Sequence, residues 1–206
     1  MNILITAGAT WVKIDDVRVI TNIFSGRTGL FLAKSFASAG HSVTLLINPH
    51  CVNRRLNGVE TVYYHYFEEF KSLIYKLLNN NKYSAIIHSA AVSDYRLENY
   101  VSGKMSSGKD RLKLELIPTE KIIKEMRTLA KKSLIVQFKL EASSDNLINL
   151  AYESLQENNS DLVVANCLRD VQSRYKGFLI NKNKEVLAVS SKSCLFLALE
   201  RRIMFA

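Results

Sequence analysis

A long polar stretch, GATWVKIDDVRVITNIFSGRTG, follows the first apolar run of the chain and spans residues 8–29. It matches neither the dinucleotide pattern G-x-G-x-x-G nor the phosphate loop G-x-x-x-x-G-K-[ST]. Instead, Gly26 and Gly29 open a helical pattern, and the free N–H groups of a helix N-terminus attract anions. Long loops in compact domains are usually functional, with a plain surface loop as the alternative. We therefore expect a phosphate or substrate site here, with these candidates: Gly8, Asp15, Asp16, Arg18, Asn22, Ser25, Gly26 and Arg27.

A second candidate segment follows the apolar run YSAIIHSAAV (83–92). Its small residues Ser89, Ala90 and Ala91 would let a flat ring or a backbone approach closely. Asp94 could accept a hydrogen bond from a nucleobase amino group or meet a cation, and a local bond within the loop is the alternative. His88 fits a satisfied strand-end residue better than a catalyst, because the four histidines are scattered and form no ligand cluster.

A lysine between glycines and serines is the third feature that could do chemistry. Lys104 stands in SGKMSSGKDRLKL, and Lys109 is its nearby competitor. We expect residues 98–112 to form a mobile flap that closes over phosphates. A solvated surface lysine is the alternative interpretation.

The composition limits the class of protein. The net charge of +9 favours anionic partners, but the basic residues are dispersed and no nucleic-acid motif is present. The chain has no apolar run of roughly 18 residues and no signal peptide, which predicts a cytoplasmic protein that spans no membrane. With no C-x-x-C pair, metal-ligand cluster or nucleophile motif, the expected site binds anions and positions reactants.

The elements that must position these residues alternate between two periods. Buried strands are predicted at 2–8, 41–48, 59–66, 83–92, 134–142 and 161–168, and helices at 29–39, 67–80, 119–132, 145–159 and 191–205. Thr119 and Asp145 are the predicted N-caps. A half-exposed strand is expected at 111–117, and a hairpin at 177–190 that turns at 181–184. This order predicts one α/β domain over residues 1–206, with a doubly wound, mainly parallel sheet.

The carboxyl ends of the parallel strands indicate where the ligand-binding site should lie. Ligands of doubly wound sheets bind beyond these ends, at the point where the strand order reverses. That rule selects the loops at 8–29, 88–107, 117–121 and 138–144, which contain the candidates above.

Seven stretches together resemble the phosphopantothenoylcysteine synthetase family, also called phosphopantothenate–cysteine ligase. They are ITAGAT, IDDVRVITNIFSGRTG, AAVSDYRL, GKM, LIPTEKII, QFKLEA and DLVVAN, in the family's order over about residues 5–166. The resemblance implies a Rossmann-like fold with an inserted β flap that also serves dimerisation. It implies that 4′-phosphopantothenate and cysteine are joined through an acyl-nucleotidylate in coenzyme A biosynthesis, with CTP as the expected nucleotide and ATP as the alternative.

The resemblance also assigns residues by position. Asn22, Arg18 and Lys104 match the residues that handle the acyl intermediate and the transferring phosphate. Nucleotide-binding positions fall on His88, Ser89, Ala90, Asp94, Lys104, Pro118, Thr119, Glu120, Lys121 and Phe138. The phosphate and substrate positions are Gly8, Ser25, Gly26, Arg27 and Ala91. No metal-binding residue is implied, because Mg²⁺ accompanies the triphosphate.

The resemblance further implies a homodimer and a separate flavin-dependent decarboxylase that acts next. Many relatives are fused to that decarboxylase. We expect this chain to be too short to include it and to bind no flavin.

The chain departs from the family pattern at several positions. The flap reads KMSS where K-I-K-K is common, and FSGR replaces SSGK in the first loop. Two lysines of many members fall on Ser154 and Asn158, which weakens the transfer of a preference for CTP. The alternatives are therefore a non-catalytic nucleotide-binding relative and an NAD(P)-dependent Rossmann oxidoreductase. The second would require an acidic residue after the second strand, where Asn48-Pro49-His50 stands.

Overall fold

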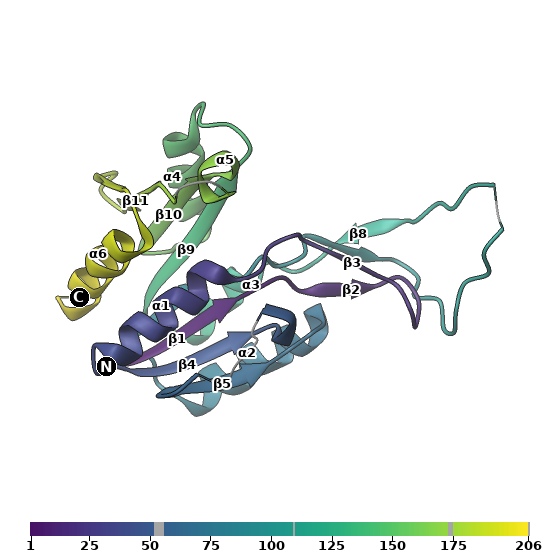
Figure 1. Cartoon of the computed structure of the whole chain (residues 1–206), viewed down its shortest axis with the longest axis horizontal. Coiled ribbons are helices and arrows are strands. Elements are labelled where there is room, and N and C mark those ends of the chain that lie inside the picture. Colours follow the sequence, from purple (N-terminus) through teal and green to yellow (C-terminus); the bar gives the residue numbers. More distant parts are fainter. Residues whose placement is uncertain (52–55, 109, 173–174, 206) are drawn as a thin grey trace.

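An eight-stranded sheet with the order β12-β11-β10-β9-β6-β1-β4-β5 forms the centre of the computed structural model, which describes residues 1–51, 56–108, 110–172 and 175–205 (Figure 1). Lys109 lies outside the described residues. Six strands are parallel: β1 (Asn2–Ala7), β4 (Ser42–Ile47), β5 (Val59–Tyr63), β6 (Ala85–His88), β9 (Leu134–Glu141) and β10 (Leu162–Cys167). An antiparallel hairpin of β11 (Gly177–Asn181) and β12 (Val186–Val189) completes one edge.

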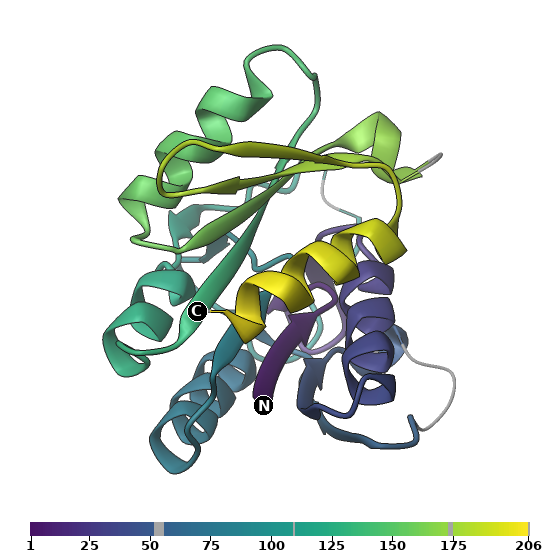
Figure 2. The same ribbon diagram turned by 90° about the vertical axis from the view of Figure 1, so that its left-hand side faces the viewer.

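Helices cover both faces of the sheet, as Figure 2 shows with the molecule turned. Strand residues alternate between the faces, so Ile3 and Ile5 of β1 pack with one helix layer and Leu4 with the other. The first layer contains α1 (Arg27–Ser38) and α6 (Lys192–Met204), and the second contains α2 (Phe67–Asn80), α3 (Ile122–Leu129) and α4 (Leu147–Glu157). A short α5 (Leu168–Gln172) follows β10, and a 3-10 turn, η1, spans Pro49–Cys51. The fold is therefore doubly wound, which confirms the predicted α/β class.

An arm projects from the carboxyl edge of this sheet (Figure 1). It consists of the hairpin β2 (Trp11–Lys13) and β3 (Val19–Thr21), the hairpin β7 (Tyr95–Leu97) and β8 (Leu116–Pro118), and the described residues 98–108 and 110–115 between β7 and β8. We call these residues the arm, and we keep the name flap for residues 98–112. The arm joins the body where the Trp11 N–H donates to the His65 carbonyl at 2.8 Å.

Three local predictions were wrong. Residues 111–115 form no strand and β8 begins at Leu116, because the antiparallel partner β7 has only three residues. Thr119 caps no helix: α3 begins later, after Lys121, and the Thr119 hydroxyl donates instead to the Ser93 carbonyl at 2.6 Å. Asp145 is also not a cap, because Asn146 occupies the N-cap position of α4 in the left-handed conformation.

No helix among the described residues is long and apolar enough to cross a membrane.

Candidate nucleotide and phosphate site

Two cavities meet at the carboxyl edge of the sheet, close to the point where the strand order reverses beside β1 and β6. The small cavity has a volume of about 180 Å³ and the large cavity about 500 Å³. Ala90, in the loop after β6, and Phe138, on β9, line both cavities. A ligand can therefore extend from one cavity into the other past these two side chains.

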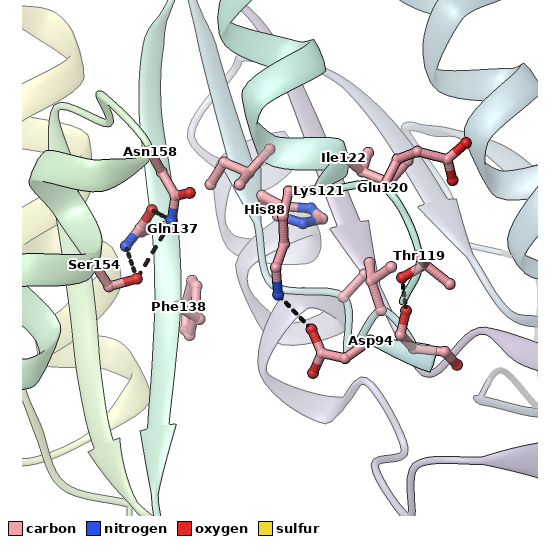
Figure 3. A pocket seen from close by; sticks show the side chains of 14 residues that line it. His88, Asp94, Thr119, Glu120, Lys121, Ile122, Gln137, Phe138, Ser154 and Asn158 are labelled. Carbon is pink, nitrogen blue, oxygen red and sulfur yellow. Dashed lines mark hydrogen bonds and ion pairs between the residues drawn. The ribbon is translucent and has the colours of Figure 1, made fainter. Parts of the chain in front are cut away.

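The small cavity collects most of the predicted nucleotide-binding residues (Figure 3). Its lining includes His88, Ala90, Asp94, Thr119, Glu120, Lys121 and Phe138. At its mouth the ammonium of Lys121 lies 2.6 Å from a carboxylate oxygen of Asp94, and both side chains are exposed. The Thr119 N–H donates to the Asp94 carbonyl at 2.9 Å, which fixes the loop after β6 against the start of α3.

An uncharged cluster, which contains the two positions Ser154 and Asn158 where the resemblance suggested lysines, forms the far wall of the small cavity (Figure 3). The buried Gln137 accepts a hydrogen bond from Ser160 at 2.8 Å and one from Asn158 at 3.1 Å, and it donates to Ser154 at 3.1 Å. Asn158 Nδ2 also donates to Ser154 Oγ at 3.3 Å. Since Ser154 Oγ accepts from both amides, its own hydrogen is free to donate into the cavity.

His88 is neutral at physiological pH. Burial lowers its pKa from 6.5 to about 4. Its Nδ1 lies 2.7 Å from the Thr6 hydroxyl oxygen, which also accepts from the Ala90 N–H at 3.4 Å. This hydrogen bond anchors the imidazole ring to β1, and its direction depends on the tautomer of His88. His88 can thus donate one hydrogen bond but cannot act as a cation for phosphate.

The large cavity collects the predicted phosphate and substrate residues. Gly8, Ser25, Gly26, Arg27 and Ala91 all line it, next to the N-terminus of α1. Ser89, predicted as a nucleotide-binding residue, lines this cavity as well. Gly26 is the N-cap of α1 with φ 65°, and no side chain caps the helix. A Cβ on Gly26 would lie 2.6 Å from the Gly8 backbone nitrogen. Only glycine permits this approach, which brings the free N–H groups of the helix to the end of β1.

Two cations line the large cavity without an acidic partner among the described residues. Arg27 comes from the start of α1 and Lys192 from the start of α6. Burial, followed by the nearby charge of Arg27, lowers the pKa of Lys192. Among the described residues, no group forms a hydrogen bond of normal geometry with the buried Tyr175 hydroxyl on the same cavity, although Asn166 lies beside it. These features suit an anionic ligand.

The family model of the DNA/pantothenate metabolism flavoprotein C-terminal domain matches residues 1–201. The chain belongs to this family. Over 173 residues it is 39% identical to the coenzyme A biosynthesis bifunctional protein CoaBC of Thermococcus kodakarensis, a match that covers 81% of this chain and 41% of that protein. The chain thus spans less than half the length of the curated relatives it matches.

Solved structures of family members have the same fold. The DNA/pantothenate metabolism flavoprotein from Streptococcus pneumoniae superposes with a TM-score of 0.88 at 26% identity, over 99% of this chain and 98% of that one. The C-terminal domain of CoaBC superposes with a TM-score of 0.80 at 28% identity, over 99% and 94% of the two chains.

The three catalytic candidates of this family member line neither cavity, and Pro118 does not line them either. Asn22 lies closest, because its Nδ2 donates to the carbonyl of Ala91 at 3.3 Å. Arg18 is in the turn between β2 and β3, where it pairs with Asp15 at 2.6 Å. Lys104 is exposed on the arm. The structure therefore joins Arg18 and Lys104 on the arm and separates them from the cavities.

Lys192, Tyr175 and Gln137 were missed by the sequence reasoning. Lys192 and Tyr175 lie far along the chain from the glycine loop, and no local motif marks them. Gln137 could have been found, because it is a single polar residue inside the apolar part of the strand LIVQFKLE, and a buried polar group requires a hydrogen-bonding partner. The described residues contain no group of three His, Cys, Asp or Glu side chains that could hold a metal ion.

Proposed function

We propose that this chain is a phosphopantothenate–cysteine ligase. It would join 4′-phosphopantothenate and L-cysteine to 4′-phosphopantothenoyl-L-cysteine through an acyl-nucleotidylate, as a step of coenzyme A biosynthesis. The observation that carries the proposal is the junction of the two cavities at Ala90 and Phe138. One cavity offers a half-buried aromatic ring and uncharged polar groups, and the other offers cations and a helix N-terminus. Family membership and the CoaBC relatives support the same assignment.

The reaction consists of two displacements. The carboxylate of 4′-phosphopantothenate attacks the α-phosphate of the nucleotide, and pyrophosphate leaves with the electrons of the broken P–O bond. The cysteine amine then attacks the acyl carbon, loses a proton and releases the nucleoside monophosphate. No protein nucleophile is required, so the protein contributes orientation and stabilisation of charge.

Each wall of the site has a role in this scheme. We assign the nucleobase to the small cavity, next to Phe138, and the phosphate groups to the large cavity, next to Arg27 and Lys192. Asn22, beside the Ala91 carbonyl, would orient the acyl intermediate. Lys104 and Arg18, which this structure holds away from the cavities, would close over the large cavity with the arm and stabilise the charge that grows at the transferring phosphate.

The choice of nucleotide depends on the small cavity. Ser154 and Asn158 form an uncharged wall with Gln137 at positions where the resemblance suggested lysines. A donor from Ser154 and a free acceptor on Asn158 match the ring nitrogen and the amino group of either cytosine or adenine. We propose CTP, accompanied by Mg²⁺, and ATP is the alternative.

The proposal includes assembly and cellular context. A second copy of the chain would complete a homodimer through the arm, and the proposed location is the cytoplasm. The product would pass to a flavin-dependent decarboxylase, the activity to which many relatives are fused. We expect the chain itself to bind no flavin, so the purified protein should show none of a flavin's visible absorbance.

The variants Asn22→Ala and Lys104→Ala distinguish this ligase from a protein that only binds nucleotide. Because neither side chain lines the small cavity, both variants should bind CTP with nearly the affinity of the unchanged protein. Product formation should fall by about 100-fold or more if each group acts on the transition state. Isothermal titration and a product assay on the same preparations measure the two quantities. Binding without turnover in the unchanged protein would identify a nucleotide sensor instead.

A further inference from the structure

The flap is bound to the turn between β2 and β3 on both sides of Lys104. The Gly103 N–H donates to a carboxylate oxygen of Asp16 at 2.7 Å, and the Gly103 carbonyl accepts from the Asp16 N–H at 3.1 Å. The Met105 N–H donates to Asp15 at 3.0 Å, and the Met105 carbonyl accepts from the Arg18 guanidinium at 3.4 Å. Gly103 and Met105, on either side of Lys104, thus each donate a hydrogen bond to the turn and accept one from it. The Lys104 side chain stays exposed.

Both carboxylate oxygens of Asp15 accept hydrogen bonds from the protein itself. One oxygen accepts from the Val17 N–H at 2.8 Å and the Arg18 N–H at 2.7 Å, and the other accepts from Arg18 Nη1 and the Met105 N–H. Its exposed fraction is 1%. Burial raises the pKa of this carboxyl, but the backbone N–H donors and Arg18 outweigh that effect and lower the pKa overall. Asp15 is therefore ionised, and no oxygen is left for a substrate.

Asp16, which is exposed, binds the flap through both of its carboxylate oxygens. It accepts from the Tyr100 hydroxyl with one oxygen and from the Gly103 N–H with the other. The hydrogen bond from Tyr100, followed by the one from Gly103, lowers the pKa of Asp16. Lys13 lies over the Tyr100 ring, 5.8 Å from its centre, which adds a cation–π contact to the same corner.

We propose that Asp15 and Asp16 form a clasp that positions Lys104 and Arg18 as one preorganised pair of cations. The clasp rests on the proposed function, because Lys104 and Arg18 are the groups assigned there to the transferring phosphate. Asp15 and Asp16 are positioning residues and touch no reacting atom. A displacement of a catalytic group by about 1 Å can lower a rate by roughly 100-fold, so the two carboxylates control the rate through Lys104.

Trypsin cleavage after Lys104 tests the clasp without reference to activity. Trypsin needs an extended, locally opened chain, so the clasp should protect the Lys104–Met105 bond in the unchanged protein. The variant Asp16→Ala removes both acceptors at an exposed position and should raise the cleavage rate there about tenfold or more. Asp145→Ala, a change of another exposed aspartate on the loop before α4, is the matched control. Equal cleavage rates in all three proteins would overturn the clasp.

A double-mutant cycle tests the positioning role. Asp16→Ala should lower kcat about 10- to 100-fold in the unchanged background and should have no further effect in the Lys104→Ala background, because it acts only through Lys104. A general structural role would lower kcat in both backgrounds, and that result would overturn the proposal. If the unchanged protein forms no product, the ligase assignment fails, and the trypsin experiment still decides whether the clasp exists.

Discussion

Arg27 and Lys192 begin two different helices, and both line the large cavity. Burial, followed by the positive charge of Arg27, lowers the pKa of Lys192, because both effects disfavour its charged form. An anion between them would remove this repulsion and gain charge-assisted hydrogen bonds. At the scale of single residues, phosphate recognition thus depends on a lysine that joins the site only through the fold.

Replacement of Lys192 by methionine should weaken triphosphate binding selectively. A hydrogen bond to a charged group contributes about 1.5–3 kcal/mol, so the Kd for CTP should rise by about 10- to 100-fold. The Kd for CMP should change little, because the small cavity is untouched. Lys34→Met, at an exposed position of α1, is the matched control, and isothermal titration measures both constants for the unchanged protein and the two variants. An equal loss for CTP and CMP would contradict the assignment of the phosphates to the large cavity.

His88 should make the free energy of unfolding depend on pH. The imidazole binds a proton near pH 6.5 when unfolded but only near pH 4 in the fold. The unfolded state therefore binds more protons between these values, and stability is lost as the pH falls through this window. The loss attributable to His88 amounts to up to about 3 kcal/mol. Urea unfolding of the unchanged protein and of His88→Gln at several pH values measures it as a difference. Parallel pH curves for the two proteins would contradict a neutral, buried His88.

The short strands of the arm were harder to predict from the sequence than the long helices of the body. The helix at 67–80 was predicted with the bounds that α2 has, because Phe67, Phe70, Ile74 and Leu77 repeat at the helical period. By contrast, β2 and β3 have three residues each, too few for an alternating pattern to be recognised in a loop. Their positions depend on pairing with each other and on the contact between Trp11 and His65. The hairpin of β2 and β3 was therefore missed, although residues in its turn were identified as functional.

The arm should also hold a dimer together. Its exposed apolar side chains, from 39% to 65% accessible, are Val17, Tyr95, Tyr100, Val101, Leu112 and Leu116. A second copy would cover this surface, because exposed apolar groups gathered on one projecting element favour association. The double variant Leu112→Asp with Leu116→Asp should sediment as a monomer, whereas the control Leu197→Asp on α6 should remain dimeric. A monomeric unchanged protein at micromolar concentration would contradict the dimer.

Across the whole molecule, the glycine loop and the strand ends were enough to predict where the cavities lie. Parallel strands of a doubly wound sheet end at one edge, so Gly26, Ser89 and Thr119 had to converge there. The distance between Lys104 and the cavities could not be predicted, because it depends on how the arm leaves the sheet (Figure 1). Lys192 was also beyond reach, since only tertiary packing brings it to the large cavity.

Pyrophosphate release is the measurement that tests the ligase assignment most directly. Purified protein would be incubated with 4′-phosphopantothenate, Mg²⁺ and either CTP or ATP, with and without cysteine. We expect pyrophosphate release with CTP. We expect mass spectrometry to detect 4′-phosphopantothenoyl-L-cysteine only when cysteine is present. Pyrophosphate release with ATP but not with CTP would support the ligase assignment and identify ATP, not CTP, as the nucleotide. A folded protein that binds nucleotide and releases pyrophosphate with neither would contradict the account.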